Sequence, residues 1–306
     1  MDSAITIGGY IVPNEVNSEF YNTTPATMEQ DSEINRICKE ISYSTETIKP
    51  NDVYSVLIDN VYDPSKFWLI LHVKERQLFE QYITNYYKEK KILMTENHIK
   101  MYATCIVCID SVYYRAIVLP TLLQNKAKLR VFLIDYGQCV NIALDNIFYI
   151  FKKHRTVPRF AIRGALADVV PINRHEPWTR ADLYEFSLLI SEKQLLAKII
   201  EIDSQEKVLH IALFSVNKSA VVSINKKLIE NGIATHGTWI YNSNYKISKY
   251  RRKIKYMHLI PTFHAIETGM VPSSLWEQSL IKEVPLDLLQ RPYYEYQNIN
   301  CSIFDS

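Results

Sequence analysis

Two short stretches, Tyr-Tyr-Arg-Ala at 113–116 and Val-Phe-Leu-Ile-Asp-Tyr-Gly-Gln at 131–138, contain the most informative chemistry in the chain. Each sets an aromatic ring beside a charged residue within a β-type run, and the two charges, Arg115 and Asp135, are opposite in sign. Aromatic rings with polar tips are typical of recognition surfaces. We therefore predict a binding site here, and the sequence contains no comparable grouping for catalysis.

The composition allows a folded protein and gives no sign of a strongly charged one. A chain of 306 residues with 47% hydrophobic content can bury a substantial core. Its 21 tyrosines and only 7 glycines argue against Gly-rich phosphate loops. A formal net charge of +2 creates no overall field toward nucleic acid or membrane.

Cysteine usage and hydropathy predict a soluble intracellular protein. The cysteines are odd in number and dispersed, which fits reduced thiols. They are Cys38, Cys105, Cys108, Cys139 and Cys301. The segment after Met1 lacks a basic and apolar leader, and no apolar run approaches the roughly 20 residues that span a bilayer.

The binding stretches lie within a region of short β-type runs separated by polar turns. These runs are Tyr102–Ile109, Tyr113–Leu119, Leu129–Asp135 and a weaker one near Cys139–Ile142. Four or five short strands within about 50 residues predict a small, strongly bent antiparallel barrel.

The sequence before this barrel predicts two strands and a helix. Residues 53–58 and 67–71 are β-rich and flank a Pro-containing turn at 62–65. Apolar residues then recur at helical spacing, and the charged residues 88–91 end the segment. The apolar positions are Leu78, Phe79, Tyr82, Ile83 and Tyr86.

The sequence after the barrel predicts further strands and two helices. Thr179, with Asp182 three residues later, forms the pattern of a capped helix N-terminus. Residues 195–202 and 208–214 predict a hairpin, and residues 224–229 a short helix that ends at Asn231-Gly232. The fold class is therefore α+β.

Three regions follow from these patterns. Residues 1–52 form a mostly flexible arm with one short helix suggested by the spacing of Ile34, Ile37 and Ile41. Residues 53–235 form the folded domain, and residues 236–306 a tail with a basic cluster and limited structure of its own.

The ordered set of motifs resembles an extended Tudor domain over about residues 53–235. The matching segments are 113–116, 134–138, 158–167, Trp178 and 228–234. The resemblance implies a five-stranded Tudor barrel, about 100–150, inserted into a staphylococcal-nuclease-like OB-type domain. It also implies that the halves of this outer domain are about 53–75 and 155–235.

The resemblance also implies a function and a setting. Extended Tudor domains read methylated arginine, commonly symmetric dimethylarginine in the tails of Piwi-type proteins, and many act in cytoplasmic or perinuclear germ granules. We therefore expect a protein of germline small-RNA silencing, the piRNA pathway, whose partner presents an Arg-rich peptide and which requires no cofactor.

The family's aromatic cage is incomplete in this sequence. Its four ring positions fall on Cys108, Tyr114, Leu133 and Tyr136, and its amide position falls on Gln138. Two missing rings weaken methylarginine recognition by roughly 1–4 kcal/mol. The remaining half cage suits an unmodified arginine or another flat polar group. A one-residue shift that brings in Phe132 would turn that side chain to the opposite face.

Other residues of these motifs are interpreted as structural support. Arg115 and Asp135 are predicted to form an ion pair that stabilises the barrel, with direct ligand contact as the alternative. Gly137 permits the turn after Tyr136. Trp178 is interpreted as a core anchor or packing lid.

Two enzymatic or metal-binding interpretations find less support. Cys105 and Cys108 have metal-compatible spacing, but a second ligand pair is absent, which favours buried thiols over zinc. A nuclease needs clustered carboxylates. The available acidic residues are Asp59, Asp63, Glu201 and Asp203, and turns or strand edges explain them.

A basic cluster in the tail interleaves cations with Tyr250 and Tyr256, which is typical of contacts to single-stranded RNA. A solvated basic linker or a localisation signal is the favoured interpretation of this cluster. The candidate contacts are Lys249, Arg251, Arg252, Lys253 and Lys255.

Together these observations predict a non-catalytic adaptor that binds an arginine-containing peptide, methylated or unmethylated. The alternatives are an RNA-binding or scaffold protein with a vestigial pocket, and a degenerate nuclease.

Overall fold

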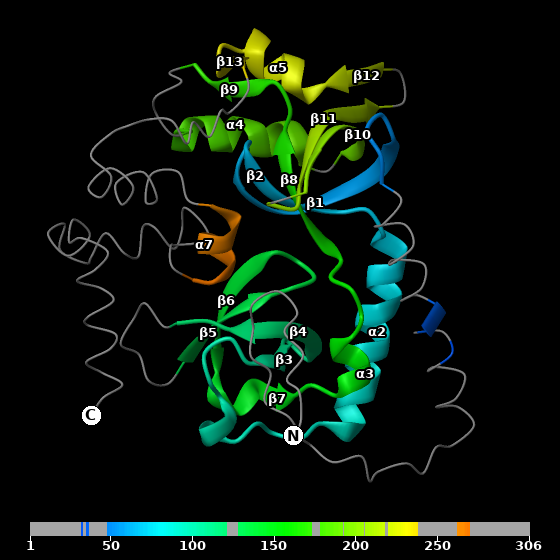
Figure 1. Cartoon of the computed structure of the whole chain (residues 1–306), viewed down its shortest axis with the longest axis vertical. Helices are drawn as coiled ribbons and strands as arrows, with labels where there is room; N and C mark the ends of the chain where they lie inside the picture. The colour runs from blue at the N-terminus through cyan, green and yellow to red at the C-terminus, as the bar shows by residue number, and fades with distance from the viewer. Residues whose placement is uncertain are drawn as a thin grey trace, which may run out of the picture. The chain divides into compact units, whose positions relative to one another are not determined.

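The computed structural model describes residues 48–120, 128–172, 178–191, 193–204, 206–217, 220–237 and 262–269, together with Ser32, Asn35 and Arg36 (Figure 1). It divides the chain into two compact units. The inserted unit is Ile70–Ala161, and the outer unit combines Lys49–Leu69 with the chain from Ile162 onward. The basic residues 246–255 and most of the predicted N-terminal arm lie outside the described residues.

Five antiparallel strands form the barrel sheet of the inserted unit, in the order β6-β5-β4-β3-β7. They are β3 (Thr104–Ile109), β4 (Val112–Val118), β5 (Lys128–Leu133), β6 (Gln138–Ala143) and β7 (Ile147–Tyr149). Two 3-10 helices, η1 (Glu96–His98) and η2 (Leu144–Asn146), precede β3 and β7. The four predicted runs correspond to β3–β6, whereas β7 had no run of its own.

A two-residue turn fixes the register of β3 against β4. Asp110 and Ser111 have φ values of 48° and 67°. Positive φ at both central residues is the hairpin geometry that matches the twist of the flanking strands. The resulting register pairs Val107 with Tyr114 and Cys108 with Tyr113.

Strand alternation separates two apolar clusters in this unit. Val107, Ala116 and Leu133 belong to the cluster within the sheet. Tyr113 belongs to the second cluster, which packs against α2 (Val73–Lys90). The short helix α3 (Lys152–Arg155) lies beside α2 (Figure 1). The buried stripe of α2 is Arg76, Phe79, Ile83, Thr84 and Tyr87.

The outer unit is a closed five-stranded ring, which fits the OB-type domain implied by the resemblance. The ring closes because β10 pairs with both β1 and β11. Its strands are β1 (Val53–Asp63), β2 (Lys66–Ile70), β8 (Ala161–Leu166), β10 (Gln194–Asp203) and β11 (Val208–Asn217). A short strand, β12 (Ala220–Ser223), pairs with the end of β11.

Close packing in this ring requires a glycine in β8. A Cβ atom at Gly164 would lie 2.6 Å from side-chain atoms of both Phe67 and Leu69. Phe67 and Leu69 are fully buried, so neither side chain has room to move away.

Two helices of the outer unit begin where the sequence predicted. In α4 (Arg180–Ile190), the Thr179 hydroxyl accepts a hydrogen bond from the Asp182 amide, and the Asp182 carboxylate accepts one from the Thr179 amide. Helix α5 (Ile224–Glu230) ends before Gly232, which has a φ of 71°. The small strands β9 (Val169–Pro171) and β13 (Ala234–His236) pair with each other.

A short helix from the tail also belongs to the outer unit. This helix, α7 (Phe263–Glu267), sets the ring of Phe263 edge-on to Trp68 at 5.3 Å. Glu267 accepts hydrogen bonds from Trp68 and Arg163. Little structure was expected after residue 235, so the prediction was wrong for α7.

No helix in the described part of the chain is long and apolar enough to cross a bilayer.

Candidate functional site

Tyr114 and Tyr136 form a right-angled pair of half-exposed rings in the inserted unit. Their centroids are 5.3 Å apart, and the ring planes meet at 81°. Tyr114 comes from β4, and Tyr136 from the turn that follows β5. Two perpendicular rings of this kind present an electron-rich face and an edge to a flat cation.

The turn that holds Tyr136 is fixed by its own backbone. The amides of Tyr136 and Gly137 both donate to the carbonyl of Leu133, at 3.2 and 2.9 Å. Gly137 has a φ of 71°, in the left-handed region where glycine is not strained. The predicted role of Gly137 in this turn is therefore consistent with its conformation.

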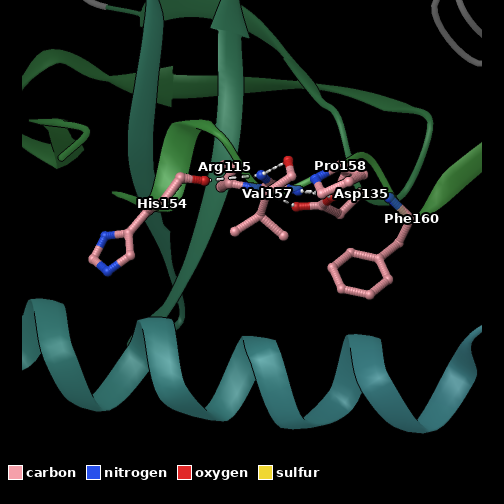
Figure 2. Close-up of polar contacts among 6 residues, drawn as sticks. All are labelled: Arg115, Asp135, His154, Val157, Pro158 and Phe160. Atoms are coloured by element: carbon pink, nitrogen blue, oxygen red, sulfur yellow. Dashed lines mark hydrogen bonds and ion pairs between the residues drawn. The ribbon is translucent and has the colours of Figure 1, made fainter. Parts of the chain in front are cut away.

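Arg115 and Asp135 form the ion pair expected from the sequence, and it is buried (Figure 2). The Arg115 side chain donates from Nε to Oδ2 of Asp135 at 2.8 Å and from an η nitrogen to Oδ1 at 2.6 Å. Asp135 also accepts a hydrogen bond from the Phe160 amide at 3.2 Å. A bidentate pair of this kind has a fixed geometry, so it anchors the residue that precedes Tyr136.

The rest of the Arg115 guanidinium faces three backbone carbonyls. It donates to the carbonyls of His154 at 2.9 Å, Val157 at 2.6 Å and Pro158 at 2.9 Å. A guanidinium has five N–H donors, and all five are thus used inside the protein. Arg115 is 2% exposed and therefore has no donor left for a ligand.

The two cage positions without an aromatic ring, Leu133 and Cys108, lie in different parts of the barrel sheet. Leu133 is 4% exposed and belongs to the cluster against which Tyr114 and Tyr136 also pack, so it lies beneath the tyrosines. Cys108 is paired with Tyr113, which places it on the other face of the sheet from Tyr114. The structure therefore groups Tyr114, Leu133 and Tyr136 and separates Cys108 from them.

Gln138 is exposed and begins β6, two residues after Tyr136. Its register partner is Leu133. An exposed amide at this corner remains available for a hydrogen bond to a ligand. The predicted RNA contacts between Lys249 and Lys255 lie outside the described residues.

Arg76 is a residue of this site that the sequence analysis missed. Its Cζ lies 4.4 Å from the centroid of the Tyr136 ring, and the residue is only 8% exposed. It occupies the first position of the buried stripe of α2, where helical periodicity favours an apolar residue. A cation at such a position is the signal that would have identified it.

A small pocket lies between α2 and the tyrosines. Arg76 and Glu80 from α2 line it together with Tyr114 and Tyr136, and its volume of about 10 Å³ holds about one water molecule. Burial, and next Glu80 and Asp110, raise the pKa of Tyr114 above its ordinary value, while Arg76 lowers it. The Tyr114 hydroxyl therefore stays protonated at neutral pH.

The metal and nuclease interpretations do not match the geometry of their residues. Cys105 and Cys108 lie on opposite faces of β3, and burial raises the pKa of Cys105 to about 12. Asp63 accepts hydrogen bonds from the Ser65 amide and from Lys66, and Asp203 accepts one from the Glu206 amide. These two carboxylates stabilise turns.

Trp178 makes one polar contact that fits its predicted anchoring role. Its Nε1 donates to the Ser65 hydroxyl at 2.8 Å, within the outer unit. This bond ties the residue before the N-cap of α4 to the turn between β1 and β2.

Comparison with known proteins gives a consistent result. Residues 48–168 match the family model described as Tudor domain. The human Tudor domain-containing protein 6 is 25% identical over 222 residues, which cover 69% of this chain and 10% of that protein. The chain thus spans about a tenth of the length of the curated relatives it matches.

Two solved structures extend the comparison. The extended Tudor domain TD3 of mouse TDRD1, in complex with a MILI peptide containing dimethylarginine, has a TM-score of 0.54 and 19% identity, covering 62% of this chain and 96% of that one. The extended Tudor domain of Drosophila melanogaster Papi, in a variant bound to a Piwi N-terminal peptide, has a TM-score of 0.50 and 19% identity. The match covers 61% of this chain and 100% of that one.

Proposed function

This chain has the extended Tudor fold, and we propose that it acts as a non-catalytic adaptor that binds an arginine-containing peptide of a partner protein. The observation that carries the proposal is the right-angled pair of Tyr114 and Tyr136, with centroids 5.3 Å apart. A guanidinium is flat and weakly hydrated, so it stacks well on such rings.

The two rings set the expected strength and selectivity of binding. Each ring contributes roughly 0.5–2 kcal/mol to the binding of a cation, so two rings supply about 1–4 kcal/mol, against roughly 8 kcal/mol for a micromolar complex. The dissociation constant should therefore lie above the low micromolar range. Methyl groups gain most from a cage that surrounds them, and here Leu133 is covered while Cys108 lies on the other face. The preference for a methylated over an unmodified arginine should therefore be small.

The relatives suggest a class of partner and a setting. The structures of mouse TDRD1 and Drosophila Papi contain peptides of MILI and Piwi. By analogy, the partner of this chain is a Piwi-type protein with an Arg-rich tail, in small-RNA silencing in cytoplasmic germ granules. The turn-stabilising roles of Asp63 and Asp203 support the absence of nuclease activity.

A titration with three versions of one Arg-rich peptide tests the proposal. Calorimetry should give dissociation constants of about tens to hundreds of micromolar for the unmodified, monomethylated and symmetrically dimethylated forms, within about tenfold of one another. Tyr136→Ala should weaken binding about threefold to thirtyfold, because one ring is lost. A preference for the dimethylated form far above tenfold would contradict the incomplete cage.

Tyr184 provides a matched control for the loss of a tyrosine. It lies on α4 in the outer unit and is 63% exposed. Tyr184→Ala should therefore leave peptide affinity unchanged. Equal losses of peptide affinity in Tyr136→Ala and Tyr184→Ala would show that the peptide does not bind at the tyrosine pair.

A second candidate function is an RNA-binding or scaffold protein with a vestigial pocket. The burial of Leu133 and the placement of Cys108 favour it, because they leave half a cage. Absence of binding to all three peptides, with RNA binding that weakens steeply with salt and is reduced in Arg252→Ala, would support this function instead.

A further inference from the structure

We propose that Arg76 is a competitor for the peptide arginine, held within the same pocket by the chain itself. This inference rests on the proposed function and adds a determinant of affinity to it. Its basis is the position of the Arg76 guanidinium, 4.4 Å from the centroid of the Tyr136 ring. A peptide guanidinium that stacks on Tyr136 needs that same ring surface.

The chemistry of the pocket favours a cation, and Arg76 is the cation already there. Glu80 lines the pocket with the two tyrosine rings, and Asp135 lies beside them. Asp135 is held by its bidentate bonds to Arg115, and the pocket therefore has carboxylates on both sides of the tyrosine rings. Arg76 and Glu80 are one helical turn apart on α2, so both point toward the same side of the helix.

The backbone of α2 cannot move to uncover Tyr136. Phe79, Ile83 and Tyr87 follow Arg76 along the buried stripe and are each at most 3% exposed. Shifting the helix would break this core, which costs far more than one stacking contact. Release of the ring therefore requires movement of the Arg76 side chain rather than of the helix.

The small pocket volume agrees with an occupied site. About 10 Å³ holds one water molecule but no guanidinium. A second guanidinium beside Arg76 would also meet a like charge at short range. A peptide arginine thus gains its stack on Tyr136 only when Arg76 gives up its own, and the net gain is small.

Removal of the competitor should strengthen binding. Arg76→Gln, which keeps much of the side-chain length without the charge, should bind the unmodified Arg-rich peptide about threefold to thirtyfold more tightly than the wild type. Arg76→Lys keeps the charge but has no planar face to stack, so its affinity should fall between the two. The gain should disappear in the double variant Arg76→Gln with Tyr136→Ala.

Lys74→Gln is the matched control. Lys74 is an exposed residue of the same helix, so this variant removes one positive charge near the site without touching Tyr136. Its affinity should equal that of the wild type. An equal gain of peptide affinity in Lys74→Gln and Arg76→Gln would show that the effect comes from the overall charge of the protein, and this result would overturn the proposal.

A direct readout follows the Arg76 side chain itself. Protons above an aromatic face resonate upfield, so the Arg76 Nε–H signal, assigned by its loss in Arg76→Lys, should lie upfield in the wild type and move downfield on saturation with peptide. A signal that stays upfield in the bound protein would overturn the proposal, because the peptide would then bind without displacing Arg76.

The outcomes separate this inference from the proposed function. If the wild type binds the peptide and Arg76→Gln binds no better, the role of Arg76 as a competitor is overturned and the proposed adaptor function is retained. If only Arg76→Gln binds, both hold. If neither protein binds any arginine peptide, both are overturned.

Discussion

At the scale of single residues, Arg115 shows how a charged side chain can belong entirely to the interior. Its guanidinium bonds Asp135 and three carbonyls, and its Cζ lies 4.8 Å from the centroid of the Phe79 ring. Such a bond pattern depends on the planar fork of arginine. The neighbour of Tyr114 in the sequence thus stabilises the turn beside Tyr136 and keeps no donor for a ligand.

Replacing Arg115 by lysine should therefore destabilise the protein strongly. One ammonium cannot reach Asp135 and three carbonyls together, which leaves buried polar groups without bonds. We expect Arg115→Lys to lower the free energy of unfolding by about 3–5 kcal/mol in urea denaturation. Arg155→Lys, at an exposed position of α3, should stay within about 0.5 kcal/mol. A loss below about 1 kcal/mol in Arg115→Lys would contradict this account.

His154 is a second buried polar residue, and it is held neutral. Its two ring nitrogens bond the hydroxyls of Tyr82 at 3.1 Å and Tyr87 at 3.0 Å, and it is fully buried. A neutral imidazole has one donor and one acceptor, which these two hydroxyls satisfy. Burial, and next the charges of Lys153 and Arg115, lower the pKa of His154 to about 3.

This shift predicts a loss of stability in acid. Above about pH 6.5 the imidazole is neutral in both states, whereas between pH 6.5 and 3 only the unfolded chain binds its proton. Stability should fall with decreasing pH in this window, by up to about 1.4 kcal/mol per pH unit from this residue. In His154→Gln, the free energy of unfolding should decrease less steeply with falling pH, by that amount per pH unit.

Urea denaturation at several pH values checks this prediction. When the free energy of unfolding is plotted against pH, wild type and His154→Gln should run parallel above about pH 7 and approach each other between about pH 6 and 4. Parallel curves over the whole range would show that His154 takes up its proton equally in both states.

Sequence reasoning found the residues whose partners are near in their motifs and missed those defined by distant contacts. Tyr114, Arg115, Asp135 and Tyr136 belong to two recognisable motifs, and the ion pair between them is present. Arg76 stacks on a residue 60 positions later in the chain, and a lone cation on a helix carries no such information. Its place on the buried stripe is the only local clue.

At the scale of elements, the helices and strands that could be predicted are those specified by residues close together in the sequence. The N-terminus of α4 was predicted because Thr179 and Asp182 form a capping box within one turn. The strands β7, β9, β12 and β13 have three or four residues each, too few for an alternating pattern. They exist because neighbouring strands pair with them.

The five-residue helix α7 is the clearest element of this kind. It is stabilised by contacts with Trp68 and Arg163, which lie about 100–200 residues earlier in the sequence. Phe263 is 6% exposed, so Phe263→Ala should remove its packing and cost about 3 kcal/mol in the free energy of unfolding, measured in urea. Tyr184→Ala, at an exposed aromatic residue, is the control, with a change within about 0.5 kcal/mol. Equal stability of the two variants would show that α7 contributes little.

At the scale of the whole chain, one unit interrupts another. The predicted interruption of an OB-type domain by a barrel follows the resemblance, and the observed units have this order. The pairing of β10 with both β1 and β11, which closes the outer ring, could not be predicted from hydrophobic periodicity. The pattern of apolar residues in a strand does not determine which strand pairs with it. Pairing of segments on both sides of an insertion is a long-range property.

The pairing of β2 with β8 has a consequence for the order of folding. Leu69 and Gly164 are in close contact in the outer ring, and Ile70 and Ala161, the two ends of the inserted unit, share one apolar cluster. Joining β2 to β8 across about 90 unfolded residues would cost roughly 4 kcal/mol of loop entropy. Once the inserted unit has folded, its ends are already together, and the outer ring closes as if β2 and β8 were a hairpin. We therefore expect the inserted unit to fold first, so that the barrel with the tyrosine pair serves as the nucleus for the rest of the domain.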